Sequence, residues 1–253
     1  MRVDINADLG ESFGAYTLGQ DERLMRAITS ANVACGFHAG DPSVMRRTLR
    51  LAREAGVAVG AHPGFPDLVG FGRREMKVSA GEAEDFVLYQ IGALAGMAAA
   101  EGMRLQHVKP HGALFNMAVH EAALSGAIAR AVAAFDRSLI LFGLPGSEIV
   151  MAGRREGLRV ASEVFADRAY EPDGTLASRR KAGSVIHDAD AVVARAVRLI
   201  TEGTVVATDG STLRLEADTI CVHGDTPGSD VLAARVREGL EAAGVRVTAI
   251  SVA

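Results

Sequence analysis

Four of the seven histidines of the chain stand directly after short apolar runs. The runs are ANVACGF before His38, VAVGA before His62, LQHVKP before His111 and TICV before His223. Gly, Pro or Asp follows each histidine within a few residues, and a helical pattern comes next. Imidazole side chains can move a proton, bind a metal ion or stabilise a developing charge. Their repeated placement at the ends of expected strands therefore points to chemistry.

Asp8 and Glu11 occupy the matching place near the amino terminus, within the run RVDINADLGE. A polar residue at the carboxyl end of one strand can be an accident. The same placement after five strands indicates a ring of polar side chains at one end of a barrel. Parallel α/β barrels carry their catalytic groups at this rim. We therefore expect the chain to be an enzyme.

Strand-like apolar runs alternate with helical patterns along the whole chain. We expect strands near residues 2–6, 31–36, 57–61, 105–109, 138–142, 159–164 and 219–223, with residues 245–250 as a candidate eighth. Helices are expected over residues 21–28, 43–55, 80–101, 121–135, 147–156, 189–202 and 230–243. This order predicts a TIM-like (β/α) barrel, seven-stranded and irregular, formed by one domain over residues 1–253. An open doubly wound sheet is the alternative, but it would gather ligands at one switch point and would not explain a ring.

Composition excludes several classes of function. The net charge of −4 gives no excess of basic residues to bind the phosphates of nucleic acid. The 5% aromatic content offers few rings on which bases could stack. The longest apolar stretch, around GALAGMAAA, is too short and too glycine-rich to span a bilayer. Cys35 and Cys221 lie far apart in sequence, which fits a reducing compartment better than a disulfide. With no signal peptide before the first strand, we expect a cytoplasmic protein.

The period-two alternation of a strand predicts which polar residues point into the barrel. His107, Lys109 and His111 share one face of their strand, and Asn6 and Asp8 share one face of the first strand. A buried lysine needs carboxylate partners, and the first strand and its exit supply them. The alternative to a functional site is an internal ion-pair network that serves only the structure.

Some candidates have an equally simple structural interpretation. His38 or His62 alone could be a hydrogen-bonded structural histidine, and Cys35 is more typical of a small core residue than of a nucleophile. His223 and Asp225 flank a glycine that allows close backbone approach.

Two segments poor in regular structure, residues 63–78 and 166–187, follow expected strand ends. Such loops can be lids or binding loops, or ordinary surface excursions. Arg73 lies in the first and Arg168 in the second, and Glu163 directly precedes the second. Arginine pairs with carboxylates in a bidentate manner, so these loops could hold an acidic substrate.

Motifs for nucleotide and metal binding are absent from the sequence. No G-x-x-x-x-G-K-[ST] run is present, and GLPGSE at residues 143–148 opens a helix but lacks the lysine. No His-Glu-x-x-His pair is present. A metal held by Asp8, His38 and His62 would need ligands from three strands, and spacing gives no specific support for it. The metal content is therefore left open.

Six motifs, taken together and in order, resemble the 5-oxoprolinase A-subunit family, also called the LamB/YcsF family. They are VDINADLGESFG, ANVACGFHAGDP, GAHPGFPDLVGFGRR, VKPHGALFN, SEVFADRAYEPDGTLASR and CVHGD. The resemblance implies an α/β barrel akin to polysaccharide deacetylases. It implies ATP-dependent opening of 5-oxo-L-proline to L-glutamate, with ADP and phosphate as products, Mg²⁺ accompanying ATP, and partner subunits B and C. The deacetylase-type triad uses a His-x-x-x-His pair, whereas this sequence has His38 followed by Pro42.

The reaction implied by the resemblance suggests roles for the rim residues. Lys109 and His111 would stabilise negative charge that develops on the lactam. Asp8 or Glu11 would be the general base that activates water. The expected substrate-binding residues are Asn6, His38, His62, Arg73, Glu163, Arg168, His223 and Asp225, with Arg73 or Arg168 on the substrate carboxylate.

Two other functions remain open from the sequence. The chain could be a metal-dependent deacetylase or amidohydrolase that needs no ATP. It could also be a non-catalytic subunit that binds 5-oxoproline while its partners perform the chemistry. ATP-dependent glutamate formation distinguishes these functions.

Overall fold

The computed structural model of the chain describes residues 1–222 and 228–251. Its strands are β1 (Arg2–Leu9), β2 (Ser30–Ala34), β3 (Ala58–His62), β4 (Leu105–Val108), β5 (Ile140–Gly143), β6 (Arg159–Phe165), β7 (Thr204–Val206), β8 (Thr212–Arg214), β9 (Thr219–Val222) and β10 (Arg246–Val247). Its helices are α1 (Asp21–Leu24), α2 (Pro42–Ala55), α3 (Ala80–Ala100), α4 (Gly112–Ala118), α5 (Ala122–Phe135), α6 (Glu148–Arg155), α7 (Ala189–Glu202) and α8 (Ser229–Ala242).

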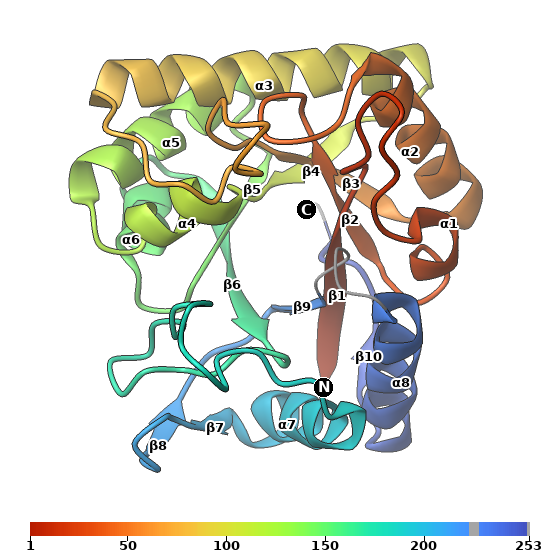
Figure 1. Cartoon of the computed structure of the whole chain (residues 1–253), viewed down its shortest axis with the longest axis vertical. Helices are drawn as coiled ribbons and strands as arrows, with labels where there is room; N and C mark the ends of the chain where they lie inside the picture. The colour runs from red at the N-terminus through yellow and green to blue at the C-terminus, as the bar shows by residue number, and fades with distance from the viewer. Residues whose placement is uncertain (223–227, 252–253) are drawn as a thin grey trace.

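Seven parallel strands close into a barrel in the order β1-β2-β3-β4-β5-β6-β9, and β9 pairs with β1 to complete the ring. Helices surround these strands in Figure 1, with α3 along one side and α7 on the opposite side. The prediction of a seven-stranded, irregular (β/α) barrel is therefore confirmed. The open doubly wound sheet is wrong, because that sheet would leave two edges unpaired.

Three details differ from the sequence-based expectation. The candidate eighth strand is only β10, which pairs with Arg2 and Val3 beyond the stretch where β1 meets β9. The antiparallel β7–β8 hairpin lies outside the barrel and was not predicted. Helix α4 was not predicted either, since it is short and follows His111 directly.

Local signals position the helices that pack around the barrel. The side chain of Asp41 accepts hydrogen bonds from the first turn of α2, and Gly56 ends this helix in a left-handed conformation. Ser79 and Glu82 form a capping box at the start of α3. The apolar faces of these helices bury side chains such as Leu49 and Ile91 against the outside of the strands. Among the described helices, none is both long and apolar enough to cross a membrane.

Candidate functional site

The interior of the barrel is polar in successive layers along β1, whose alternate residues point inward. At the amino-terminal end of the strands, the Asp4 carboxylate accepts hydrogen bonds from the hydroxyls of Thr29, Ser30 and Thr219, at 2.6, 2.7 and 2.5 Å. Burial raises the pKa of Asp4, although these hydroxyl bonds oppose the rise. Because each carboxylate oxygen of Asp4 accepts at least one hydroxyl bond, this layer supports the barrel rather than a ligand.

The next layer joins Asn6, Asn32 and His107. The Asn32 side-chain amide donates to Asn6 Oδ1 at 2.7 Å and to Asp8 Oδ1 at 2.9 Å. His107 Nε2 lies 2.8 Å from Asn32 Oδ1, and the ring stacks on Phe142. Burial, together with the nearby charge of Lys109, lowers the pKa of His107 to about 3. His107 is therefore neutral at physiological pH.

Lys109 forms the third layer and is the central cation of the barrel. Its Nζ lies 2.9 Å from Asp8 Oδ1 and 2.8 Å from Glu163 Oε1, and it donates to Cys221 Sγ at 3.1 Å. Burial favours a neutral amine, but Asp8, Cys221 and Glu163 together hold the pKa of Lys109 well above its ordinary value. Lys109 is therefore a charged ammonium. The partners that its burial requires were predicted on β1, and Glu163 on β6 supplies a further one.

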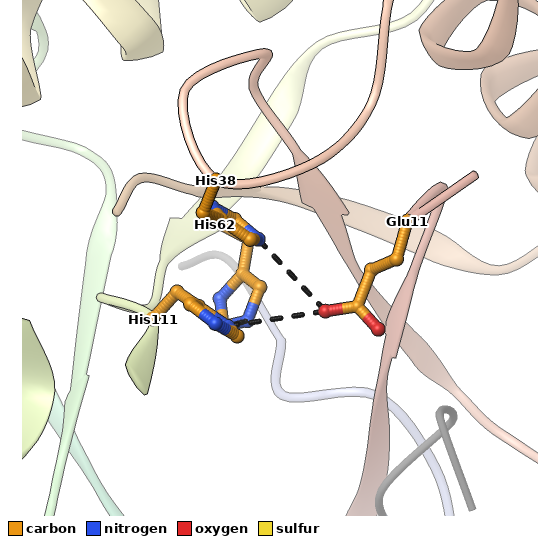
Figure 2. A group of neighbouring side chains, drawn as sticks. All are labelled: Glu11, His38, His62 and His111. Atoms are coloured by element: carbon orange, nitrogen blue, oxygen red, sulfur yellow. Dashed lines mark hydrogen bonds and ion pairs between the residues drawn. The ribbon is translucent and has the colours of Figure 1, made fainter. Parts of the chain in front are cut away.

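Three histidines and one glutamate form a cluster at the carboxyl ends of the strands. Glu11, His38, His62 and His111 each offer a ligand atom, and these four atoms lie within 4.8 Å of one another. Figure 2 shows Glu11 approaching the three rings from the opposite side, with dashed lines to His38 and His111. Glu11 Oε1 is 3.8 Å from His38 Nε2 and from His111 Nδ1.

The rings of this cluster are buried and close together. His38 stacks on His111 with 3.8 Å between ring centroids, and His62 Nε2 lies 3.0 Å from His111 Nδ1. Burial and the neighbouring His111 lower the pKa of His38 well below its ordinary value. Burial and the neighbouring His62 do the same to the pKa of His111. His38 and His111 are therefore neutral imidazoles.

The loop over residues 63–78 packs directly on the cluster. A Cβ at Gly64 would lie 2.7 Å from His38 Nδ1, and a Cβ at Gly72 would lie 2.7 Å from the Cβ of His38. Gly72 also has φ +63°, which favours glycine. The Phe71 carbonyl lies 2.8 Å from His111 Nε2. The glycines of this segment thus let its backbone contact the imidazoles.

A cavity of about 710 Å³ opens beside the cluster at the same end of the barrel. Its wall includes Asp8, His62, Lys109 and His111 from the strand ends. Both long loops border it, because Arg73 lies in residues 63–78, and Arg168 and residues 175–180 lie in the second loop. The carboxyl ends of the strands therefore surround a polar cavity of a size that suits a small substrate.

The predicted site residues fall into four groups by position. Asp8, His62, Lys109, His111, Arg73 and Arg168 line the cavity. Glu11 and His38 belong to the adjoining cluster, while Asn6 and Glu163 are buried beneath it on Lys109. His223 and Asp225 lie outside the described residues.

Arg168 is more constrained than a solvent-facing loop charge. It is 5% exposed, and its guanidinium donates to the carbonyls of Ala177 and Ser184 at 2.6 and 3.3 Å. Burial and the neighbouring Arg179 lower its pKa to about 10, so it remains charged. Arg168 therefore connects the start of its loop to the middle and to the end of that loop, and it also borders the cavity.

Sequence reasoning missed three contributors to this site. Asn32 links two layers, Cys221 accepts from Lys109, and the Phe71 carbonyl orients His111. Asn32 and Cys221 could have been found by applying the period-two alternation to their strands. The carbonyl gives no signal in a side-chain pattern. Cys35 is buried core, as expected, and burial raises the pKa of its thiol to about 12.

The fold and the polar rim define a parallel α/β barrel with a cluster of ionisable side chains at the carboxyl ends of its strands. Residues 3–253 match the LamB/YcsF family, and the chain belongs to this family. A Bacillus licheniformis relative, named as the A subunit of 5-oxoprolinase, is 56% identical over 250 residues, which cover 99% of each chain. A Pyrococcus abyssi relative of the same name is 54% identical and covers 98% of this chain and 97% of that protein.

A solved structure supports the same grouping. The lactam utilization protein from Thermus thermophilus is 51% identical, with a TM-score of 0.94, and covers 99% of this chain and 100% of that chain. The resemblance noted from the six sequence motifs is therefore confirmed at the level of the family.

Proposed function

We propose that the chain binds 5-oxo-L-proline in the rim cavity and opens its ring to L-glutamate, with ATP and Mg²⁺ and together with partner subunits B and C. The observation that carries this proposal is the near full-length identity of 56% to relatives named as the 5-oxoprolinase A subunit. The cavity supports it, because Asp8, Lys109 and Arg73 place an acid, a buried cation and an exposed cation around one small space.

ATP addresses the chemical difficulty of this reaction. A five-membered lactam is a stable amide, so its carbonyl carbon is a poor electrophile. Transfer of the γ-phosphoryl group to the lactam oxygen releases ADP and makes that carbon more reactive. Water then adds, the ring C–N bond breaks with a proton delivered to nitrogen, and a second water releases phosphate. The residues of the chain need to bind the acid, move protons and stabilise charge on oxygen.

The geometry favours particular roles in these steps. Asp8 borders the cavity and is the candidate general base, since Lys109 at 2.9 Å keeps its carboxylate close to a positive charge. Lys109 and His111 border the same space and are the candidate donors to the developing negative charge. Arg73 is the candidate partner of the substrate carboxylate. Arg168 adds its positive charge to the wall of the cavity, while two of its nitrogens donate hydrogen bonds to loop carbonyls.

The test is glutamate formation by the purified chain alone and by the chain reconstituted with its partners, each with and without ATP. We expect glutamate only from the complete set with ATP, and none when the set contains Asp8→Asn. The matched control His187→Ala changes an exposed histidine that does not border the cavity. Full activity of the set with Asp8→Asn would contradict a catalytic role for this site and favour a chain that only binds the substrate.

A second candidate function is amide hydrolysis that depends on a metal and not on ATP. The cluster of Glu11, His38, His62 and His111 beside the cavity favours it. Ring opening by the chain alone, without ATP, would establish this second function and contradict the first.

A further inference from the structure

We propose that Glu11, His38, His62 and His111 form a binding site for one divalent transition-metal cation, with Zn²⁺ as the best match. This inference goes beyond the proposed function, because it requires neither substrate, ATP nor partner chains. It depends on the direction of ring nitrogens, on one buried ring that makes no hydrogen bond to the described residues and on the local balance of charge.

Backbone carbonyls assign the tautomers of two rings. A carbonyl oxygen only accepts, so a ring nitrogen bonded to it must carry the N–H group. His62 Nδ1 lies 2.7 Å from the Lys109 carbonyl, and His111 Nε2 lies 2.8 Å from the Phe71 carbonyl. The ring nitrogens that can offer a lone pair to a ligand are therefore His62 Nε2 and His111 Nδ1. These two atoms face each other.

The facing nitrogens are separated by a distance typical of two ligands on one ion. His62 Nε2 and His111 Nδ1 are 3.0 Å apart, where two lone pairs repel each other unless a cation or a proton lies near both. With metal–nitrogen bonds of about 2.1 Å, neighbouring ligands in tetrahedral or octahedral sites lie about 3.0–3.4 Å apart. The 3.8 Å from Glu11 Oε1 to each of two rings requires only a small inward movement of one flexible side chain.

His38 provides an independent observation that points to a ligand. Its ring is 1% exposed, and among the described residues neither of its nitrogens has a hydrogen-bond partner. A buried polar atom without a hydrogen-bond partner destabilises the folded chain. The ring stacks on His111, and Figure 2 shows its nitrogen facing Glu11. A cation beside Nε2 would satisfy this atom.

The charge around the cluster also favours a cation. Among the described residues, Asp8, Glu11 and Glu163 bring three carboxylates close to the cluster, and the ammonium of Lys109 pairs with two of them, Asp8 and Glu163. Asp8 Oδ1 already accepts from Lys109 and Asn32, so Glu11 is the carboxylate that completes the histidine set. The guanidinium of Arg73 lies over the ring of Phe71, 5.0 Å from its centre.

The donor set selects the class of metal. Three imidazole nitrogens and one carboxylate oxygen suit Zn²⁺ and other first-row divalent ions, whereas Mg²⁺ prefers oxygen ligands and retains water. His62 and His111 also line the cavity, so the ion would lie at its wall. A cation there supplies Lewis acidity to a carbonyl or water in the cavity.

The test measures binding of Zn²⁺ to the full-length chain after removal of metals with a chelator. Titration calorimetry should show one equivalent bound, and competition should show much weaker binding of Mg²⁺. His38→Ala should lower the Zn²⁺ affinity at least about 10-fold, because loss of a metal ligand should weaken binding no less than loss of a residue that orients a ligand. Diffraction data collected at the zinc edge should place the ion between Glu11 and the three rings.

Two variants guard against a simple failure to fold. Glu11→Gln preserves the shape of the side chain but removes its charge, and it should weaken Zn²⁺ binding while the chain still unfolds cooperatively on heating. His187→Ala removes an exposed histidine and should bind Zn²⁺ like the natural sequence. Equal Zn²⁺ affinity in the natural chain, His38→Ala and Glu11→Gln would overturn the proposal, as would an ion located elsewhere.

Discussion

Lys109 and Glu163 form an ion pair of 2.8 Å inside the barrel, where their side chains are 4% and 0% exposed. Lys109 directly follows β4 and Glu163 lies on β6, with β5 between the two strands, and the side chains meet because both point into the barrel. Two buried charges lose their hydration, and their mutual attraction offsets part of this cost. A change to this pair should therefore alter both the stability of the barrel and the charge beside the cavity.

Replacing Lys109 should reduce both activity and stability. Lys109→Met leaves Asp8 and Glu163 without their ammonium, and removal of one partner of a buried pair costs about 3–5 kcal/mol. The double variant Lys109→Met/Glu163→Gln should recover part of this loss, because it removes one of the unpaired carboxylates. Urea unfolding measures both values. Arg130→Met, which breaks the exposed pair with Glu84, is the control and should cost at most about 1 kcal/mol.

This expectation changes how a Lys109 variant is interpreted. From sequence alone, loss of activity without unfolding would identify Lys109 as the donor to the lactam oxygen. Because Nζ of Lys109 pairs with two carboxylates, a Lys109 variant can lose activity through lost stability. Its activity therefore has to be compared with its free energy of unfolding. Equal stability of Lys109→Met and the natural chain would show that the buried pair contributes no net stabilisation.

The polar ring was predictable because it depends on two simple periodicities. Alternation along a strand places Asn6, Asp8 and Lys109 inside a barrel, and parallel strands bring their carboxyl ends together. The same argument placed His38 and His62 at the rim. These residues meet as expected, since the closed order of strands leaves no other place for side chains that point inward.

The metal-binding arrangement of the cluster could not be predicted in this way. Its members lie at or beyond the ends of four different strands, so no sequence spacing identifies them as a set. The assignment of tautomers needs the Lys109 and Phe71 carbonyls, and backbone atoms give no sequence pattern. The constraint on Arg168 was also hidden, because its partners are carbonyls of a loop without regular structure.

Arg73 should determine the affinity for an acidic substrate without affecting the barrel. It is exposed, lines the cavity and lies 5.0 Å from the centre of the Phe71 ring. A charge-assisted hydrogen bond contributes about 1.5–3 kcal/mol, so Arg73→Ala should raise the KM for 5-oxoproline about 10- to 100-fold. Steady-state kinetics of the reconstituted set measure this change.

The control for Arg73 lies in the same loop. Lys77 is exposed and does not border the cavity, so Lys77→Ala should leave KM unchanged. The melting temperatures of both variants should match that of the natural chain. A KM that is unaffected by Arg73→Ala would remove this residue from substrate binding and leave Arg168 as the candidate.

Glu101 should make the packing of α3 on α2 sensitive to acid. Its carboxylate accepts from Arg46 and Arg50 at 2.6 and 3.1 Å, and Arg53 lies at 3.3 Å. Hydrogen bonds from Arg50 and Arg46 lower the pKa of Glu101 to about 2. Because the folded pKa is below the unfolded one, this stabilisation is present above pH 4.5 and is lost as the pH falls toward 2.

Melting temperatures across this pH range test the role of Glu101. Glu101→Gln should melt a few degrees below the natural chain at neutral pH, and the difference should shrink as the solution becomes acidic. Glu54→Gln changes a neighbouring exposed glutamate on α2 and should show neither effect. A difference that stays constant with pH would mean that the ionised carboxylate is not the cause.

Gly60 should be the most sensitive glycine of the barrel wall. A Cβ at this position would lie 2.2 Å from the ring of His107, at the point where the register between β3 and β4 shifts. Gly60→Ala must displace His107 from Phe142 and from Asn32, and such overpacking costs about 1–3 kcal/mol. Gly92→Ala is the matched control, because nothing lies within 4 Å of its added Cβ on α3. Alanine in this helix should instead stabilise the chain by about 0.5–1 kcal/mol. Urea unfolding of the two variants should therefore shift in opposite directions, and a neutral Gly60→Ala would show that the His107 layer tolerates movement.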